Sequence, residues 1–81
     1  MKLIDAEIGK IYKVKEINLE YVVKRRLEIL GMTENVNISI LNKKRHGAVI
    51  IKVRGTRFAL GKKFAEGIEL GGASEWKTIL T

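Results

Sequence analysis

Residues 48–60 read AVIIKVRGTRFAL, and this stretch decides the fold class. Valine or isoleucine stands at positions 49, 51 and 53, and these alternate with Ile50, Lys52 and Arg54. This period of two is typical of a strand that buries one face. The Gly55-Thr56 pair then provides a turn before a second short run, Arg57 to Leu60. The stretch therefore predicts an antiparallel β-hairpin.

Further short strands are expected on both sides of this hairpin. Residues 10–17 are rich in Ile, Tyr and Val between a glycine and an asparagine, and residues 36–41 alternate apolar and polar side chains. Both patterns indicate half-buried strands. Residues 42–47 form a basic polar tip that joins 36–41 to 48–54 as antiparallel neighbours. Residues 62–66 could form one helical turn, and residues 68–70 a closing strand.

One substantial helix is predicted, over about residues 19–30. Its apolar positions recur at helical spacing, with charged side chains on the opposite side. Asn18 is a candidate N-cap, and Gly31 stands where a left-handed C-terminal cap would be. The apolar positions are Leu19, Val22, Val23, Leu27 and Leu30.

A chain of 81 residues is long enough for one compact domain and too short for two. About five short strands with a single inserted helix, and no helical crossovers between the later strands, predict a mainly β fold. A small SH3-like antiparallel barrel fits this pattern best. An open antiparallel sheet covered by the helix is the alternative, and spacing alone does not separate the two.

The net charge of +7 belongs to one part of the chain. Between Glu34 and Glu66 there are eight lysines and arginines and no acidic residue, whereas the rest carries eight basic and nine acidic residues. Charge on exposed edge strands also prevents aggregation, so this pattern alone names no partner. The cations expected to contact a partner are Arg25, Arg26, Lys43, Lys44, Arg45, Arg54, Arg57, Lys62 and Lys63.

The residue inventory argues against catalysis, a metal site or a cofactor site. His46 is the single histidine, and there is no cysteine, so common nucleophile and metal-water sites lack their components. The longest strictly apolar run, residues 48–51, is far shorter than the roughly 20 residues of a membrane helix. We therefore expect a non-enzymatic, soluble protein that does not insert directly into a membrane and whose lack of cysteine is compatible with a reducing cytosol.

Several short blocks in order along the chain resemble the FeoA family, the small ferrous iron transport protein A. The most specific is the combination of the block at the end of the predicted helix with the later Val-Arg-Gly turn. The matching residues are Leu3, Asp5, Ala6, Gly9, Arg26, Leu27, Leu30, Gly31, Met32, Thr33, Val53, Arg54, Gly55, Ala59, Leu60, Ala65 and Ile68.

The resemblance implies an SH3-like domain over residues 1–70, followed by a C-terminal extension over residues 71–81. It implies a cytoplasmic protein-interaction module that docks on the cytosolic GTP-binding part of a FeoB-type membrane iron transporter. A small basic nucleic-acid-binding barrel is the alternative, although stacking aromatics are scarce in the basic segment, because Phe58 and Phe64 are expected to be core residues. The extension carries Trp76, Ile79 and Leu80 after a glycine-rich hinge, so packing on its own domain and homo-oligomer formation through the tail both stay open.

Overall fold

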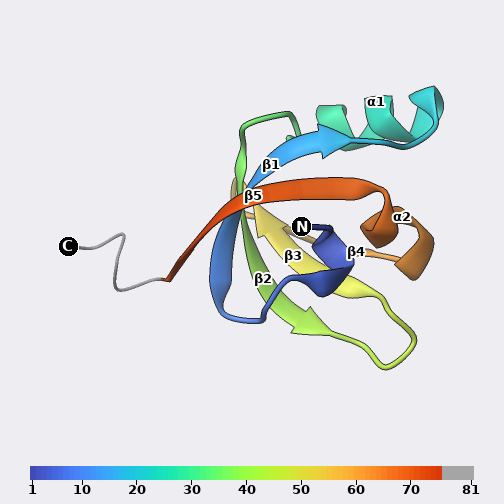
Figure 1. Ribbon diagram of the computed structural model, residues 1–81. Helices are drawn as coiled ribbons and strands as arrows, with labels where there is room; N and C mark the ends of the chain where they lie inside the picture. The colour runs from blue at the N-terminus through green and yellow to red at the C-terminus, as the bar shows by residue number, and fades with distance from the viewer. Residues whose placement is uncertain (76–81) are drawn as a thin grey trace.

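The computed structural model describes the backbone of residues 1–75 and the side chains of residues 1–72. Five antiparallel strands form one curled sheet in the order β4-β3-β2-β1-β5 (Figure 1). The prediction of a mainly β chain with one substantial helix is therefore confirmed. The elements are η1 (Leu3–Asp5, a 3-10 helix), β1 (Lys10–Ile17), α1 (Tyr21–Ile29), β2 (Asn37–Lys43), β3 (Val49–Val53), β4 (Thr56–Leu60), α2 (Lys62–Glu66) and β5 (Ile68–Glu75).

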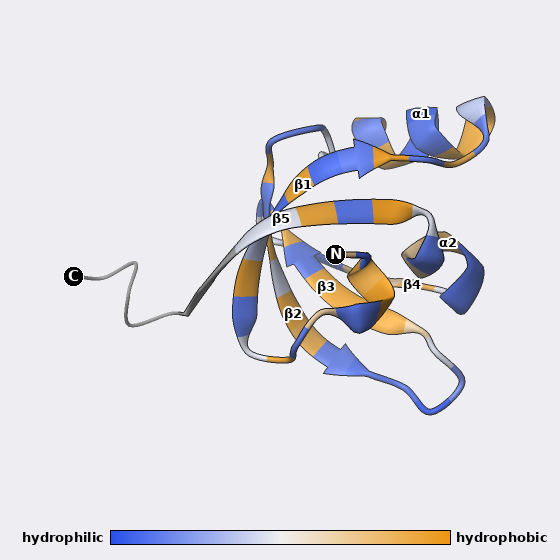
Figure 2. Cartoon of the chain, viewed as in Figure 1, coloured by the Kyte–Doolittle hydropathy of each residue, from blue (hydrophilic) through white to orange (hydrophobic). Residues whose placement is uncertain are grey.

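The core lies on the inner face of the curled sheet. Hydropathy alternates along the strands in Figure 2, and the inward positions are buried in each of β1 to β3. η1 and α2 contribute Leu3 and Ala65, both fully buried. The core residues are Leu3, Ala6, Tyr12, Val14, Ile17, Leu27, Met32, Ile38, Ile40, Val49, Ile51, Val53, Leu60, Ala65, Ile68 and Leu70.

The β3–β4 hairpin has its turn one residue earlier than the sequence predicted. Pairing runs from Val49 with Leu60 to Val53 with Thr56, which leaves Arg54 and Gly55 as the two turn residues. Their φ angles are 49° and 83°. A type I′ turn requires positive φ at both central positions, and such turns match the twist of the flanking strands. The expected Gly55-Thr56 turn was wrong because Arg54 adopts the left-handed conformation.

The helix is shorter than the predicted range of 19–30. It starts after Glu20, and the expected cap Asn18 makes no capping bond; instead its backbone N–H donates to the carbonyl oxygen of Gly67 at 2.7 Å. This contact holds the chain extended between β1 and α1. At the other end the prediction of a glycine cap is confirmed, because Gly31 has φ of 100°. The Met32 N–H bonds to Leu27 O and the Gly31 N–H to Glu28 O, the two bonds of a Schellman motif.

The buried stripe of α1 is narrower than the sequence predicted. Leu27 is buried, and Leu19 and Val23 pack partly against the core. Val22 and Leu30, predicted to share this face, are 61% and 49% exposed. α1 extends beside the end of β1 at the rim of the sheet in Figure 1, so one side of the helix meets the core while the opposite side faces solvent.

Strand boundaries differ from the predictions at β2 and β5. β2 continues to Lys43 with an irregularity between Ile40 and Asn42, and the closing strand continues to Glu75 along β1. The glycines predicted as a hinge at 71 and 72 therefore lie within a strand. Trp76, Ile79 and Leu80 lie outside the described residues.

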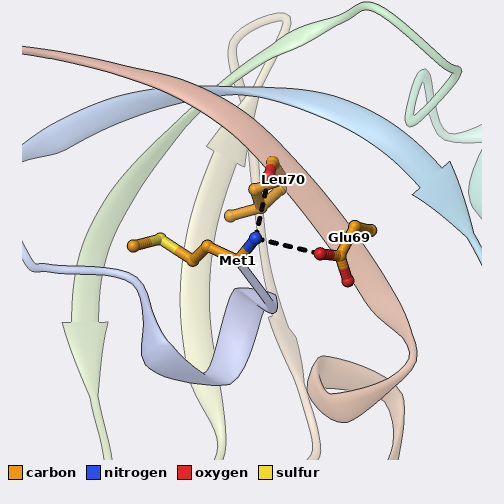
Figure 3. Close-up of polar contacts among 3 residues, drawn as sticks. All are labelled: Met1, Glu69 and Leu70. Atoms are coloured by element: carbon orange, nitrogen blue, oxygen red, sulfur yellow. Dashed lines mark hydrogen bonds and ion pairs between the residues drawn. The ribbon is translucent and has the colours of Figure 1, made fainter.

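The N-terminal segment is attached to β5. The Met1 ammonium donates to Glu69 Oε1 at 2.9 Å and to Leu70 O at 3.3 Å, as Figure 3 shows. The Leu70 N–H donates in turn to Met1 O at 2.6 Å. These bonds place η1 against the sheet, where Leu3 enters the core.

Candidate docking surface

The outer face of the sheet places cations opposite one another. Lys52 of β3 pairs with Arg57 of β4 on one side and with Ser39 of β2 on the other. Ser39 and Lys52 each stand between buried neighbours, so they point away from the core, and the exposed Arg57 lies on the same face because it pairs with Lys52. Like charges directly opposite on neighbouring strands repel each other and destabilise the pair. Within the described residues neither Lys52 nor Arg57 has an acidic partner.

This basic surface continues across β2 onto β1. A hollow of about 420 Å³ is bordered by Lys52, Arg54 and Arg57, and a second of about 660 Å³ is bordered by Lys13 and Lys15. Asn37 borders both hollows, and no acidic residue borders either one. We call this surface the outer cationic face; it consists of Lys13, Lys15, Lys52, Arg54 and Arg57.

Sequence reasoning selected only two members of this face, Arg54 and Arg57. Lys52 was counted in the acid-free segment but was not selected, and Lys13 and Lys15 lie outside that segment. In β1 the side chains of Tyr12 and Val14 are buried while those of Lys13 and Lys15 are exposed. That alternation was visible in the sequence. Only the order of the strands shows that β1 and β3 share this surface through β2.

Arg54 has a structural contact in addition to its position on the outer cationic face. Its side chain lies against Gly31, where an added Cβ would stand 3.0 Å from Arg54 Cδ. This position is near the C-terminal end of α1, where a cation interacts favourably with the helix dipole. Arg54 therefore connects the β3–β4 turn to α1.

The basic loop between β2 and β3 is a separate cluster. The Lys43 ammonium donates to the carbonyl oxygen of Ala6 at 3.0 Å, so this cation holds the segment before β1. Lys44 and Arg45 are exposed. The Lys62 stem covers Gly47, where an added Cβ would stand 2.8 Å from Lys62 Cβ. The structure thus brings Lys62 to this loop.

Arg25 and Arg26 lie on the solvent side of α1. Both side chains are exposed, as expected for cations that contact a partner. They stand among exposed apolar side chains on the same helix, with Tyr21 at 74% and Ile29 at 79% exposure. Exposed apolar side chains gathered on one helix are typical of protein contact surfaces.

An apolar groove separates the start of α1 from α2. It has a volume of about 500 Å³ and is lined by Leu19, Val23, Lys63 and Phe64, among others. Phe64 was predicted to be a core residue, which was wrong, because it is 36% exposed at this groove. Phe58, predicted in the same way, does pack against the core.

Two carboxylates among the described residues, Glu7 and Glu69, have shifted pKa values. The described residues include no grouping of three or more His, Asp or Glu side chains that could hold a metal ion. A hydrogen bond from Lys10, together with its charge, lowers the pKa of Glu7, and a hydrogen bond from the Met1 ammonium lowers the pKa of Glu69. Both carboxylates are in exposed ion pairs, which shift pKa values without any catalytic role.

The described part of the chain includes no helix with the length and apolar character needed to cross a membrane. The longer helix, α1, has nine residues and two adjacent arginines.

Comparison with known proteins decides the family. The FeoA domain model matches residues 1–70. The chain belongs to the FeoA family. This family is linked to ferrous iron transport and consists of small accessory domains; it is not a known enzyme family. No curated protein matches the chain by sequence.

Solved FeoA structures share this fold. The FeoA protein of Chlorobium tepidum is 27% identical, with a TM-score of 0.80 over 86% of this chain and 68% of the other. An iron uptake regulatory protein, also a FeoA, is 28% identical, with a TM-score of 0.77 over 86% of this chain and 93% of the other.

FeoA of Stenotrophomonas maltophilia, solved with zinc and described as an SH3 domain protein, has a TM-score of 0.79 at 21% identity over 93% and 96% of the two chains. At this identity the likeness concerns the fold, and it confirms the predicted SH3-like architecture.

Proposed function

We propose that this FeoA-family protein is a cytoplasmic, non-enzymatic accessory protein of ferrous iron transport that docks on the cytosolic GTP-binding part of a FeoB-type membrane transporter. The observation that carries the proposal is the family match over residues 1–70. The Stenotrophomonas relative is itself described as a proposed activating factor of bacterial ferrous iron transport.

The geometry supports docking on a protein partner. The solvent side of α1 presents Tyr21, Val22 and Ile29, which are 74%, 61% and 79% exposed. Removing such side chains from water upon binding is favourable, by about 25 cal/mol for each Å² of apolar surface. The outer cationic face offers a second surface, which a partner carrying carboxylates would complement.

The test is capture of the full-length FeoB-type transporter from the same organism, purified in detergent, by the immobilised chain. We expect the native chain to retain the transporter at micromolar concentration. A variant with Ile29→Ser and Leu30→Ser should retain less, because both side chains are exposed and their loss leaves the core intact. Failure of the native chain to retain the transporter would contradict the proposal.

Binding of nucleic acid is the second candidate function, favoured by the outer cationic face. Among the described residues the aromatic side chains lie elsewhere: Tyr12 is buried, Phe58 packs on the core, Tyr21 is on α1 and Phe64 is on α2. Single-strand binders normally add stacking aromatics to their cations. Titration with RNA and with DNA over a range of salt concentrations tests this candidate, since phosphate binding weakens steeply as salt rises.

A further inference from the structure

The opposed cations Lys52 and Arg57 do not stabilise the folded chain, and the protection of an edge strand from aggregation accounts for Arg57 of β4 but not for Lys52 of the inner strand β3. They stand opposite each other on neighbouring strands, and Arg54 borders the same hollow. Such a row costs stability in the free protein. A bound anion would turn this repulsion into attraction, because each cation would then face an opposite charge.

The groups around the cations define the chemistry of the ligand. Ser39 lies opposite Lys52, and Asn37 lies between the two hollows, so hydroxyl and amide groups are available for hydrogen bonds. Half-buried apolar side chains adjoin this row: Leu41 borders the smaller hollow and Ile11 the larger one. A ligand that fits carries several negative charges and also apolar groups.

We propose that the outer cationic face binds an acidic segment of a partner protein, with carboxylates at Lys52, Arg54 and Arg57 and apolar side chains at Leu41 and Ile11. Mixed carboxylate and apolar chemistry belongs to a peptide, whereas single-strand nucleic-acid binders normally add exposed aromatics, and none of the described residues bordering the two hollows is aromatic. The inference rests on the proposed function for the identity of the partner, and on the geometry of the sheet for the binding chemistry.

A defined probe tests the binding chemistry without any transporter. The acetylated peptide EELEELEE is titrated into the ¹⁵N-labelled full chain at low and at physiological salt, and the backbone amide shifts are followed. We expect shifts at residues 37–41, 52 and 57, with affinity falling as salt rises because the charges are exposed.

A matched pair of variants distinguishes the contribution of the outer cationic face to peptide binding from the effect of the protein's net charge. The K52Q/R57Q variant removes one lysine and one arginine from the outer cationic face, and K44Q/R45Q removes the same two residue types from the exposed β2–β3 loop. We expect the first variant to bind about tenfold more weakly and the second to change affinity by less than about twofold. Thermal unfolding controls for folding, and K52Q/R57Q should keep or raise its Tm.

Three results would overturn the proposal. The first is no amide shift with the peptide at low salt. The second is equal or greater loss of affinity in K44Q/R45Q, which would assign binding to the loop or to net charge. The third is tighter binding of a mixed-sequence 12-nucleotide RNA at the same amides, which would make the ligand a phosphate backbone.

The transporter capture experiment distinguishes this inference from the proposed function. Suppose that both the native chain and K52Q/R57Q capture the transporter and that the peptide does not bind. This result supports the proposed function and contradicts the proposal that the outer cationic face is the binding surface. Peptide binding that depends on Lys52 and Arg57, without capture of the transporter, supports the face and contradicts the proposed partner.

Discussion

Tyr12 shows how a single buried polar group is satisfied in this core. Its side chain is 2% exposed, and its hydroxyl oxygen accepts a hydrogen bond of 2.9 Å from the Glu7 N–H. The bond joins the segment after η1 to β1. Burying a donor without an acceptor costs more free energy than a typical hydrogen bond contributes.

Replacing Tyr12 with Phe should therefore lower the free energy of unfolding by about 1 kcal/mol, because the ring is kept while the Glu7 N–H loses its acceptor. Urea unfolding measures the change. Tyr21→Phe is the control, since that side chain is 74% exposed and has no hydrogen bond within the described residues. An equal effect of the two substitutions would show that the Tyr12 hydroxyl has no special role.

At the scale of elements, α1 is held to the sheet by a narrow contact. Leu27 is 5% exposed and belongs to the core, whereas Ile29, two residues later, is 79% exposed. The buried residue Met32 follows the helix and bonds back to Leu27 O, so one apolar stripe and one Schellman motif position the helix.

Leu27→Ala should lower the free energy of unfolding by about 2–5 kcal/mol, because it leaves a cavity in the core. Ile29→Ala should change it by less than about 0.5 kcal/mol, since the side chain is already in solvent. Denaturant unfolding of both variants checks the contrast. A large loss in Ile29→Ala would mean that the outer side of α1 is covered in the free protein.

The β3–β4 pair carries a stability cost that a substitution can remove. Lys52→Gln should raise the free energy of unfolding by about 0.5 kcal/mol at low salt, because it ends the repulsion with Arg57. The gain should shrink in 1 M salt, where the charges are screened. Lys44→Gln, in the loop, serves as control. A gain of the same size in that control would point to net charge instead of the opposed pair.

At the scale of the whole molecule, the contact of Met1 with β5 makes stability depend on pH. A hydrogen bond from the ammonium lowers the pKa of Glu69 below its ordinary value. Glu69 therefore contributes stability at pH values above its unfolded pKa, and this contribution is lost as the pH falls through the lower pKa of the folded state.

Glu69→Gln should thus reduce Tm at neutral pH and have little effect at strongly acidic pH, where the native carboxyl is protonated. Thermal unfolding between pH 7 and pH 2 measures the difference between the two proteins. Glu66→Gln is the control, because that exposed carboxylate has no ion pair within the described residues. A difference that persists unchanged at the acidic end would exclude ionisation of Glu69 as its cause.

Local pattern determined most elements of this chain. The Ile, Tyr and Val content between a glycine and an asparagine predicted residues 10–17 as a strand with its observed boundaries, and helical spacing with Gly31 predicted the end of α1. These features depend on neighbours within a few residues. Predictions failed where a distant contact acted: Asn18 bonds to Gly67 instead of capping the helix, and Phe64 borders a groove formed with the start of α1.

The sequence by itself determined the class of fold, the family resemblance and the concentration of positive charge, because each is recorded in residue types and their spacing. Only the tertiary structure decided which cations share a surface. Strand order places Lys13 and Lys15 of β1 on the same face as Lys52 and Arg57, with β2 between them, while Lys43 bonds to Ala6. The reason is physical: strand pairing joins residues distant in the chain, and charge composition carries no information about the partner across the sheet.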